Sequence, residues 1–403
     1  MSKKALILIL GLAGFTVMAD NWVISPLLPA ISETFGTTAT TAGILITAYM
    51  IPFGIFQLVF GPLADRFGKR QVITFTMIFF TIGTALCAFA FNLGNLTLYR
   101  ALTGVFAASV MPISFALIAD LVPMAERQAA IASFMGISFL GQGLSMAIGG
   151  TMAYLINWRG AFVLYGVLSV LSVILLLTAG KKIPSARDPK SELAAPYLRL
   201  LSNRDSLFTY LTVFFEGVLI IGAFSYLGAF ISNAYGYNFL QIGFIMTAFG
   251  IMTIIGGRLS GRLAAKIGKK RLIVGGLMLA ALSDFILFAS GSVLAALLVG
   301  ISLLGLGFIF AHSTLLTIAT EFARKSRGIA MSLVAAFFMA GGGIGTAIGG
   351  KLIKAYSYTD FFLFGGIALV VVILAVMLLL SGREKAAEQA PKAMLDSKAA
   401  RQS

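Results

Sequence analysis

Charged residues are scarce in this sequence: only 11% of its 403 residues are Asp, Glu, Lys or Arg, whereas 59% are hydrophobic. A soluble globular domain carries about 25% charged residues, so this composition excludes one. The hydrophobic residues form repeated runs of roughly 20, and each run is long enough to cross a hydrocarbon core about 30 Å thick. The sequence therefore predicts a helical membrane protein with many spans.

Residues that commonly hold metals or carry nucleophilic chemistry are also rare. The chain has one cysteine, Cys87, and one histidine, His312. A single cysteine excludes an intramolecular disulfide, and the sequence shows no cluster with metal-ligand spacing. The sequence also lacks a P-loop, which excludes ATP-driven transport by this chain alone, and it lacks a hydrolytic triad. We therefore expect no enzyme activity, no cofactor and no metal site.

Basic residues outnumber acidic ones by 30 to 15, which gives a net charge of +15. In a soluble protein this charge would suggest nucleic-acid binding, but here the basic residues gather in alternate loops. All but four lie on the side that holds both termini; the exceptions are Arg100, Arg159, Lys351 and Lys354. This positive-inside pattern predicts that both termini are cytoplasmic, and it argues against a nucleic-acid partner.

Apolar runs between charged residues or Gly, Pro and Asn predict twelve membrane spans. The polar segment 181–205 separates six from six, so we expect an N-terminal six-helix bundle (1–180), a cytoplasmic linker (181–205), a C-terminal six-helix bundle (206–381) and a disordered tail (382–403). The first run would also suit a cleaved signal peptide, but it resumes after Asp20, which favours a membrane helix.

The two halves of the chain are related by a repeat with an offset of 200 residues. GILITAY…GPLADRFGKR (residues 43–70) aligns without a gap with GFIMTAF…GRLAAKIGKK (residues 243–270). The same offset places AIGG at 147–150 on AIGG at 347–350, and Arg127 on Arg327. A duplication with parallel halves is typical of transporters in which two bundles rock about a site between them.

Two motifs resemble those of the major facilitator superfamily, and the resemblance covers the chain to about residue 380. GPLADRFGKR (61–70) is similar to the family signature between helices 2 and 3; in the weaker copy at 261–270, Ala265 replaces the aspartate. LTLYRALTG (96–104) is similar to the helix 4 motif of proton-coupled members. The resemblance implies an all-α membrane protein with the major facilitator fold, twelve transmembrane helices in two pseudo-symmetric six-helix bundles.

Helix 5 narrows the resemblance to one branch of the family. Gly141, Gly149 and Gly150 match parts of the glycine-rich motif of drug:proton antiporters, although Ser145 and Met146 stand at its central Gly-Pro. The chain thus resembles the bacterial drug and sugar-efflux permeases with twelve spans, and the resemblance implies a bacterial cytoplasmic membrane as its location.

The resemblance also implies a conformational latch on the cytoplasmic side. In the family, the aspartate of the helix 2–3 signature, here Asp65, contacts the start of helix 11, here near Ser326 and Arg327, and stabilises the outward-open state. The residues assigned to the latch are Gly61, Asp65, Arg66, Gly68, Lys69, Arg70, Asp120 and Arg127. Acidic residues of the same side could pair with arginines: Asp120, Glu126 and Glu321 with Arg66, Arg127 and Arg324. The alternative is a charged loop that serves only to orient the chain.

Five ionisable residues lie within the predicted spans: Asp20, Arg100, Glu216, Asp284 and His312. Such residues are costly in the membrane unless they are paired or hydrated, so they are functional candidates by default. We assign proton coupling to Asp20, Arg100, Glu216 and His312. Asp20 and Arg100 are candidates for a switchable pair, with a static salt bridge or a purely substrate-binding role as alternatives. Glu216 and His312 could instead be hydrogen-bonded within the bundle, and Asp284 stays unassigned.

The helices that line the central cavity in the resembled fold carry many aromatic and few polar residues, which suits a largely apolar or amphipathic small molecule. The substrate-binding candidates are Asn21, Trp22, Tyr49, Phe53, Gln57, Phe115, Ser138, Gln142, Tyr226 and Phe337, with Phe224 on the same wall. With the resemblance, they predict a monomeric transporter that exports a drug or metabolite in exchange for protons by alternating access. A proton-coupled importer, a facilitator, a lipid translocase and a non-transporting sensor are the alternatives.

Overall fold

The computed structural model describes residues 2–185, 195–323 and 327–399, and the regular elements in these ranges are helices. Twelve spans are long and apolar enough to cross a membrane, as the sequence predicts. The first half comprises α1 (Lys3–Trp22) and α2 (Ile24–Thr34), α3 (Ala39–Ala42) and α4 (Ile44–Phe67), α5 (Lys69–Ala88), α6 (Leu93–Ala107) and α7 (Val110–Leu121), α8 (Met124–Leu155) and α9 (Arg159–Leu177).

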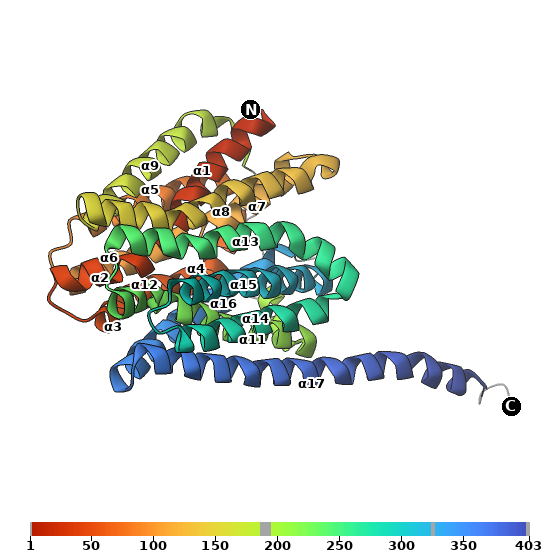
Figure 1. Ribbon diagram of the computed structural model, residues 1–403. Coiled ribbons are helices and arrows are strands. Elements are labelled where there is room, and N and C mark those ends of the chain that lie inside the picture. The colour runs from red at the N-terminus through yellow and green to blue at the C-terminus, as the bar shows by residue number, and fades with distance from the viewer. Residues whose placement is uncertain (1, 186–194, 324–326, 400–403) are drawn as a thin grey trace.

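A short 3₁₀ helix (Ala179–Lys182) and α10 (Ala195–Ser202) lie between the halves. The second half comprises α11 (Arg204–Glu216), a π-helical turn (Gly217–Ile221) and α12 (Gly222–Tyr235), then α13 (Phe239–Ile267), α14 (Lys269–Ala289), α15 (Leu294–Phe322), α16 (Arg327–Ala355) and α17 (Tyr358–Ala399). In Figure 1 the first-half helices, red to yellow, and the second-half helices, green to blue, form two bundles, with α8 and α13 side by side where they meet.

Consecutive spans alternate in direction, so their connections fall on two opposite ends of the molecule. One end holds the tight turns at Gly68 and Gly268, each followed by a lysine, Lys69 and Lys269. We call this end the basic side. The other end holds turns such as the one at Gly236, and we call it the distal side.

Several of the described spans are interrupted, one of them at Gly43 between α3 and α4, and proline explains two other interruptions. Pro26 has no N–H to donate to the carbonyl of Trp22, and α1 gives way to α2 at Val23. Pro112 likewise cannot bond to the carbonyl of Ala108, where α6 gives way to α7. A further interruption is the π-helical turn Gly217–Ile221, which matches residues 17–21 by the 200-residue offset. Such turns inside α-helices are frequent at functional sites.

The bundles meet chiefly along α4 and α16, α8 and α13, and α2 and α12. In the distal half, hydrogen bonds join them: Ser25 Oγ donates to the carbonyl of Phe224 at 2.7 Å, and Thr47 Oγ1 donates to that of Gly343 at 2.9 Å. Glycines let the backbones approach, since a Cβ on Gly243 would lie 2.9 Å from the Cα of Gly150. The distal halves of the bundles are therefore closed against each other.

The last helix extends beyond the bundle. α17 runs from Tyr358 to Ala399, and Figure 1 shows its second half projecting past the other helices. The sequence predicts disorder from residue 382 onward because that segment is polar. It is also rich in Ala, Lys and Glu, which are strong helix formers, so a segment without a core of its own still takes a helical form here.

Gly68 and Gly268 allow a comparison between two equivalent turns. Both have positive φ, +99° and +87°, so alanine at either position is strained by about 1–2 kcal/mol. A Cβ on Gly68 would also lie 2.8 Å from Ser185 Oγ, whereas no described atom lies within 4 Å of one on Gly268. We expect Gly68→Ala to lower the melting temperature in detergent more than Gly268→Ala does. An equal fall in melting temperature for the two variants would show that backbone strain alone accounts for both effects.

Candidate transport site

The first buried ion pair joins α1 to α6. Arg100 Nη1 donates to Asp20 Oδ2 at 2.7 Å and to the main-chain oxygen of Asp20 at 3.2 Å, and both side chains are fully buried. The guanidinium lies over the ring of Tyr49 at 4.1 Å and near that of Phe162 at 5.8 Å, where the aromatic faces favour the positive charge. The structure thus places Asp20 and Arg100 in direct contact.

This pair does not use all of its hydrogen-bonding capacity. Asp20 Oδ1 and the Nε and Nη2 atoms of Arg100 have no partner among the residues that the structure describes. A bidentate Arg–carboxylate pair would engage two parallel bonds and be correspondingly rigid. The contact seen here engages one carboxylate oxygen and leaves polar atoms that a proton or a polar ligand group can bind.

The second pair joins α11 to α15. His312 Nδ1 lies 3.1 Å from Glu216 Oε2. Glu216 is fully buried, and its Oε1 has no partner within the described ranges. The imidazole packs against Phe308 and Phe338, with ring centroids 5.1 and 4.4 Å away. The sequence gives no sign that Glu216 and His312 are in contact, and the structure brings their side chains together.

The two pairs lie at different depths. Asp20 is about 25 Å from the basic-side end of its helix, and Glu216 is about 18 Å from the start of α11, by the rise of 1.5 Å per residue. Asp20 lies two residues before the end of α1, and Glu216 directly precedes the π-helical turn. Each carboxylate is therefore placed where its span departs from regular α-helix.

The substrate-binding candidates do not form one cluster: some surround the first buried pair, and others lie at the interface between the bundles. Tyr49 lies under Arg100 and stacks on Phe53 at 5.8 Å, so both belong to the surroundings of the first pair. Trp22 crosses the bundle interface and contacts aromatic residues of the second half. Three amide-bearing candidates near the interface are buried, and each has at least one side-chain polar atom without a described partner: Asn21, Gln57 and Gln142.

Four other candidates make hydrogen bonds or ring contacts within or between helices. Ser138 Oγ donates to the carbonyl of Phe134 at 3.0 Å, and Phe134 packs edge-on against Phe115. Phe337 stacks on Tyr210 at 5.6 Å. The hydroxyl of Tyr226 donates to the carbonyl of Thr346 at 2.9 Å and approaches that of Thr40 at 3.4 Å. Tyr226 was expected on the cavity wall, and the structure places its hydroxyl in the distal contact between the bundles.

On the basic side, acidic residues pair with lysines, and Arg324, one of the arginines expected to pair with them, lies outside the described residues. Lys69 Nζ contacts Asp120 Oδ2 at 2.7 Å and Asp65 Oδ1 at 3.3 Å, and Lys269 pairs with Glu321. Lys69 and Lys269 are related by the 200-residue repeat, so each bundle carries an equivalent pair. The lysines are favoured because each opens a helix directly after its glycine turn, facing the acid at the end of another helix.

Asp65 faces the helix with which a latch would act. A cavity of about 130 Å³ is lined by Asp65, by Tyr197 of α10 and by Gly328 and Ile329 in the first turn of α16. Burial, with the carboxylate of Asp65 nearby, raises the pKa of Tyr197 to about 12, so its hydroxyl stays a neutral donor. Ser326 and the side chain of Arg327, the expected partners, lie outside the described residues.

The other latch candidates lie around this contact. Gly61 lines the same cavity, and Gly68 makes the turn that follows α4. The guanidinium of Arg66 lies near the ring of Phe67, and Arg70 Nη1 donates to the carbonyl of Lys181 at 2.6 Å. Arg127 is the fourth residue of α8, on the same side.

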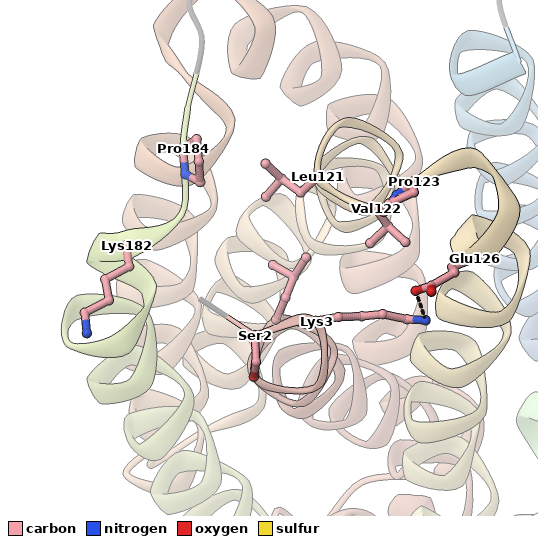
Figure 2. Close-up of a pocket in the computed structure, with 9 residues that line it drawn as sticks. Ser2, Lys3, Leu121, Val122, Pro123, Glu126, Lys182 and Pro184 are labelled. Carbon is pink, nitrogen blue, oxygen red and sulfur yellow. Dashed lines mark hydrogen bonds and ion pairs between the residues drawn. The ribbon is translucent and has the colours of Figure 1, made fainter.

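A larger cavity, of about 310 Å³, lies on the basic side of the first bundle. Figure 2 shows it between the start of α1, the connection from α7 to α8, and Lys182 and Pro184. Lys3 Nζ crosses it to Glu126 Oε2 at 2.7 Å, and this ammonium holds the pKa of Glu126 below its usual range. The cavity lies at the first turn of α1, about 25 Å by helix rise from Asp20, so it is separate from both buried pairs.

Asp284 stands apart from these groups. It is fully buried on α14, its two carboxylate oxygens have no partner among the described residues, and it faces Gly365 of α17. Because α14 and α17 pack on the far side of the second bundle from α8, Asp284 does not share the surroundings of either pair.

Three aromatic residues near these groups are not among the candidates that the sequence suggests: Phe249, Phe308 and Phe338. Phe308 could have been found, because it lies four residues before His312 and so shares its helix face. Phe249 and Phe338 come from other helices, and their proximity depends on how those helices cross.

Comparisons with known proteins agree with this architecture. A family model described as Major Facilitator Superfamily matches residues 10–324 and, in a second match, residues 209–401. An uncharacterized MFS-type transporter of Bacillus subtilis (strain 168), YceJ, is 30% identical over 351 residues, which cover 85% of this chain and 87% of that protein. The multidrug transporter protein MdtP of the same organism is 26% identical over 416 residues, which cover 88% and 76%.

Among solved structures, a POT family transporter in complex with a thioalcohol-conjugated peptide matches with a TM-score of 0.79 at 15% identity, covering 94% of this chain and 96% of that one. At this identity the likeness shows the fold alone. The twelve spans and the family match over most of the chain agree with it. The chain therefore belongs to the major facilitator superfamily and is a multi-pass membrane transporter, not an enzyme.

Proposed function

We propose that this transporter exports a small organic molecule, a drug or an amphipathic metabolite, from the cytoplasm in exchange for protons. In this proposal the protein works as a monomer in the bacterial cytoplasmic membrane, with its basic side in the cytoplasm. Its similarity to a protein named as a multidrug transporter supports this branch of the family. The basic residues of the helix connections support this orientation.

One observation carries the proposal: each bundle holds a buried carboxylate bound to a basic side chain through only one of its oxygens. The pairs are Asp20 with Arg100 and Glu216 with His312. Protonation of either carboxylate removes its negative charge and weakens the ionic contact with the helix opposite. A proton can therefore compete with the basic partner, which is what coupling proton movement to helix movement requires.

The alternating-access cycle follows from this competition. In the distal-closed structure both pairs are formed, and the carboxylates hold α1 to α6 and α11 to α15. Protons that arrive from the distal side would release these contacts and the substrate. Their loss to the basic side would restore the pairs and the site. The irregular turns beside each carboxylate give α1 and the α11–α12 span places at which to bend.

The test is transport by purified protein in liposomes with an imposed pH gradient and the planar aromatic cation ethidium as the probe. We expect wild-type protein to move ethidium against the proton flux. Asp20→Asn and Glu216→Gln should lower gradient-driven flux at least tenfold while leaving ethidium exchange without a gradient in place. Asp284→Asn is the matched control, because it removes an equally buried carboxylate far from both pairs, and it should keep the wild-type response.

Three results would contradict the proposal. Full gradient-driven flux in both variants would show that these carboxylates do not couple protons. Wild-type flux that ignores the gradient would identify a facilitator. Ethidium movement in the direction of the proton flux would identify a symporter.

A further inference from the structure

The indole of Trp22 fills a pocket that belongs to the opposite bundle. Its ring centroid lies 5.0 Å from that of Phe224, 5.8 Å from Phe249 and 6.3 Å from Phe308. These three residues come from α12, α13 and α15, whereas Trp22 is the last residue of α1. Trp22 is 4% exposed, so the pocket encloses it almost completely.

The pocket suits a flat ring but offers nothing to the polar end of the indole. Phe249 and Phe308 lie nearly parallel, at 20°, and Phe224 packs on Phe249 at 4.6 Å. The Nε1 of Trp22 has no hydrogen-bond partner among the described residues. A buried tryptophan N–H usually finds a partner, so the pocket matches an aromatic ring in general rather than tryptophan in particular.

Both walls of this contact lie next to a break in their helices. Trp22 directly precedes the interruption at Val23, where Pro26 removes a helical hydrogen bond. Phe224 lies two residues after the start of α12, immediately beyond the π-helical turn. Each side of this contact therefore has, within its own span, a place at which the helix can bend.

The pocket also continues toward the second buried pair. Phe308 stacks on Phe338 at 5.5 Å and on His312 at 5.1 Å, and His312 contacts Glu216. A ring that occupied the place of the indole would thus lie on an aromatic wall that ends at the Glu216–His312 pair. Ligand binding at this wall and the state of that pair would be physically linked.

We propose that Phe224, Phe249 and Phe308 form a subsite for a planar aromatic ring of the transported molecule, and that Trp22 occupies this subsite in the distal-closed state as an internal competitor. This inference rests on the proposed transport function and names the chemical class that the site takes. A ligand must displace the indole to bind. Because the indole ties the distal halves together, its displacement favours their separation.

The test is equilibrium binding of ethidium to purified protein in detergent, followed by fluorescence anisotropy. An internal competitor lowers the apparent affinity by the fraction of molecules in which it occupies the site. We therefore expect Trp22→Ala to bind ethidium at least tenfold more tightly than wild type, and Phe249→Leu in the same background to reverse this gain. Unchanged, weaker or undetectable binding by Trp22→Ala would overturn the proposal, because a residue that contacts the ligand directly would weaken binding when removed.

A second measurement does not depend on the folding of Trp22→Ala. The chain has two tryptophans, and the second, Trp158, is buried near the distal end of the first bundle, where its Nε1 donates to Thr34 Oγ1 at 3.0 Å. In Trp158→Phe protein all tryptophan emission comes from Trp22. Ethidium should shift this emission to longer wavelength as the indole leaves its apolar pocket, and saturation without a shift would contradict displacement. Neither readout uses a proton gradient. The binding result can therefore support the subsite even if proton coupling fails, and it can fail even if proton coupling holds.

Discussion

Arg100→Gln is expected to lower the free energy of unfolding by about 3–5 kcal/mol, the usual cost of breaking a buried ion pair from one side. The substitution would leave the carboxylate of Asp20 fully buried without its charged partner. It would also remove the guanidinium that packs on the ring of Tyr49. Equilibrium unfolding of purified protein in mixed detergent micelles measures the loss.

The double variant Asp20→Asn/Arg100→Gln tests the cause of that loss. It removes both charges, so no unpaired ion remains, and it should be more stable than Arg100→Gln alone. Arg159→Gln is the matched control: Arg159 packs on Trp158 and donates to the carbonyl of Ala90, but it lies at the distal surface. It should cost about 1 kcal/mol. If the double variant lost as much free energy of unfolding as its two single substitutions combined, the pair would carry no coupling energy.

The second buried pair should respond differently to loss of its basic partner. Histidine can be neutral at physiological pH, so the contact between His312 and Glu216 does not require two charges. The Asp20–Arg100 pair therefore carries the larger stability effect, because arginine stays charged in proteins.

The sequence was a good guide to the spans because hydropathy and charge act over whole segments. Twelve apolar runs, the repeat at 200 residues and the family motifs specify the fold without any single contact. The break at Val23 could also be read from Pro26, which removes one hydrogen bond. The π-helical turn Gly217–Ile221 could not, because it has no proline and depends on packing against α16.

A contact within the site could be predicted from the sequence where it depended only on the depth of two residues in the membrane. Asp20 and Arg100 lie at similar depths on neighbouring helices, and the structure pairs them. Depth did not suggest that Glu216 meets His312, because that contact depends on how α11 crosses α15. Nor does helix position reveal that the hydroxyl of Tyr226 bonds to backbone carbonyls. Side-chain direction within a helix layer depends on tertiary packing, which composition and periodicity do not encode.

Gly150→Leu is expected to shift the protein out of the distal-closed state. A Cβ on Gly150 would lie 2.8 Å from the Cα of Gly243 and would also overlap the carbonyl oxygen of Phe239. Both neighbours are backbone of α13, in the other bundle, so neither can yield by a change of rotamer. Overpacking of this kind costs about 1–3 kcal/mol, and each 1.4 kcal/mol changes the balance between states about tenfold. Separation of the distal halves relieves the overlap, so the distal-open state gains population.

A cysteine at position 25 reports this shift. Ser25 is 2% exposed, and its hydroxyl bonds across the interface to Phe224, so it is shielded while the distal side is closed. In a Cys87→Ser background, a polar maleimide should label Ser25→Cys several-fold faster when Gly150→Leu is present. Gly136→Leu is the matched control on the same helix, because a Cβ there meets no described atom within 4 Å. Equal labelling of the two leucine variants would show that the α8–α13 contact does not keep the distal side closed. Faster labelling only with Gly150→Leu would identify this glycine contact as one that must part for the substrate to leave.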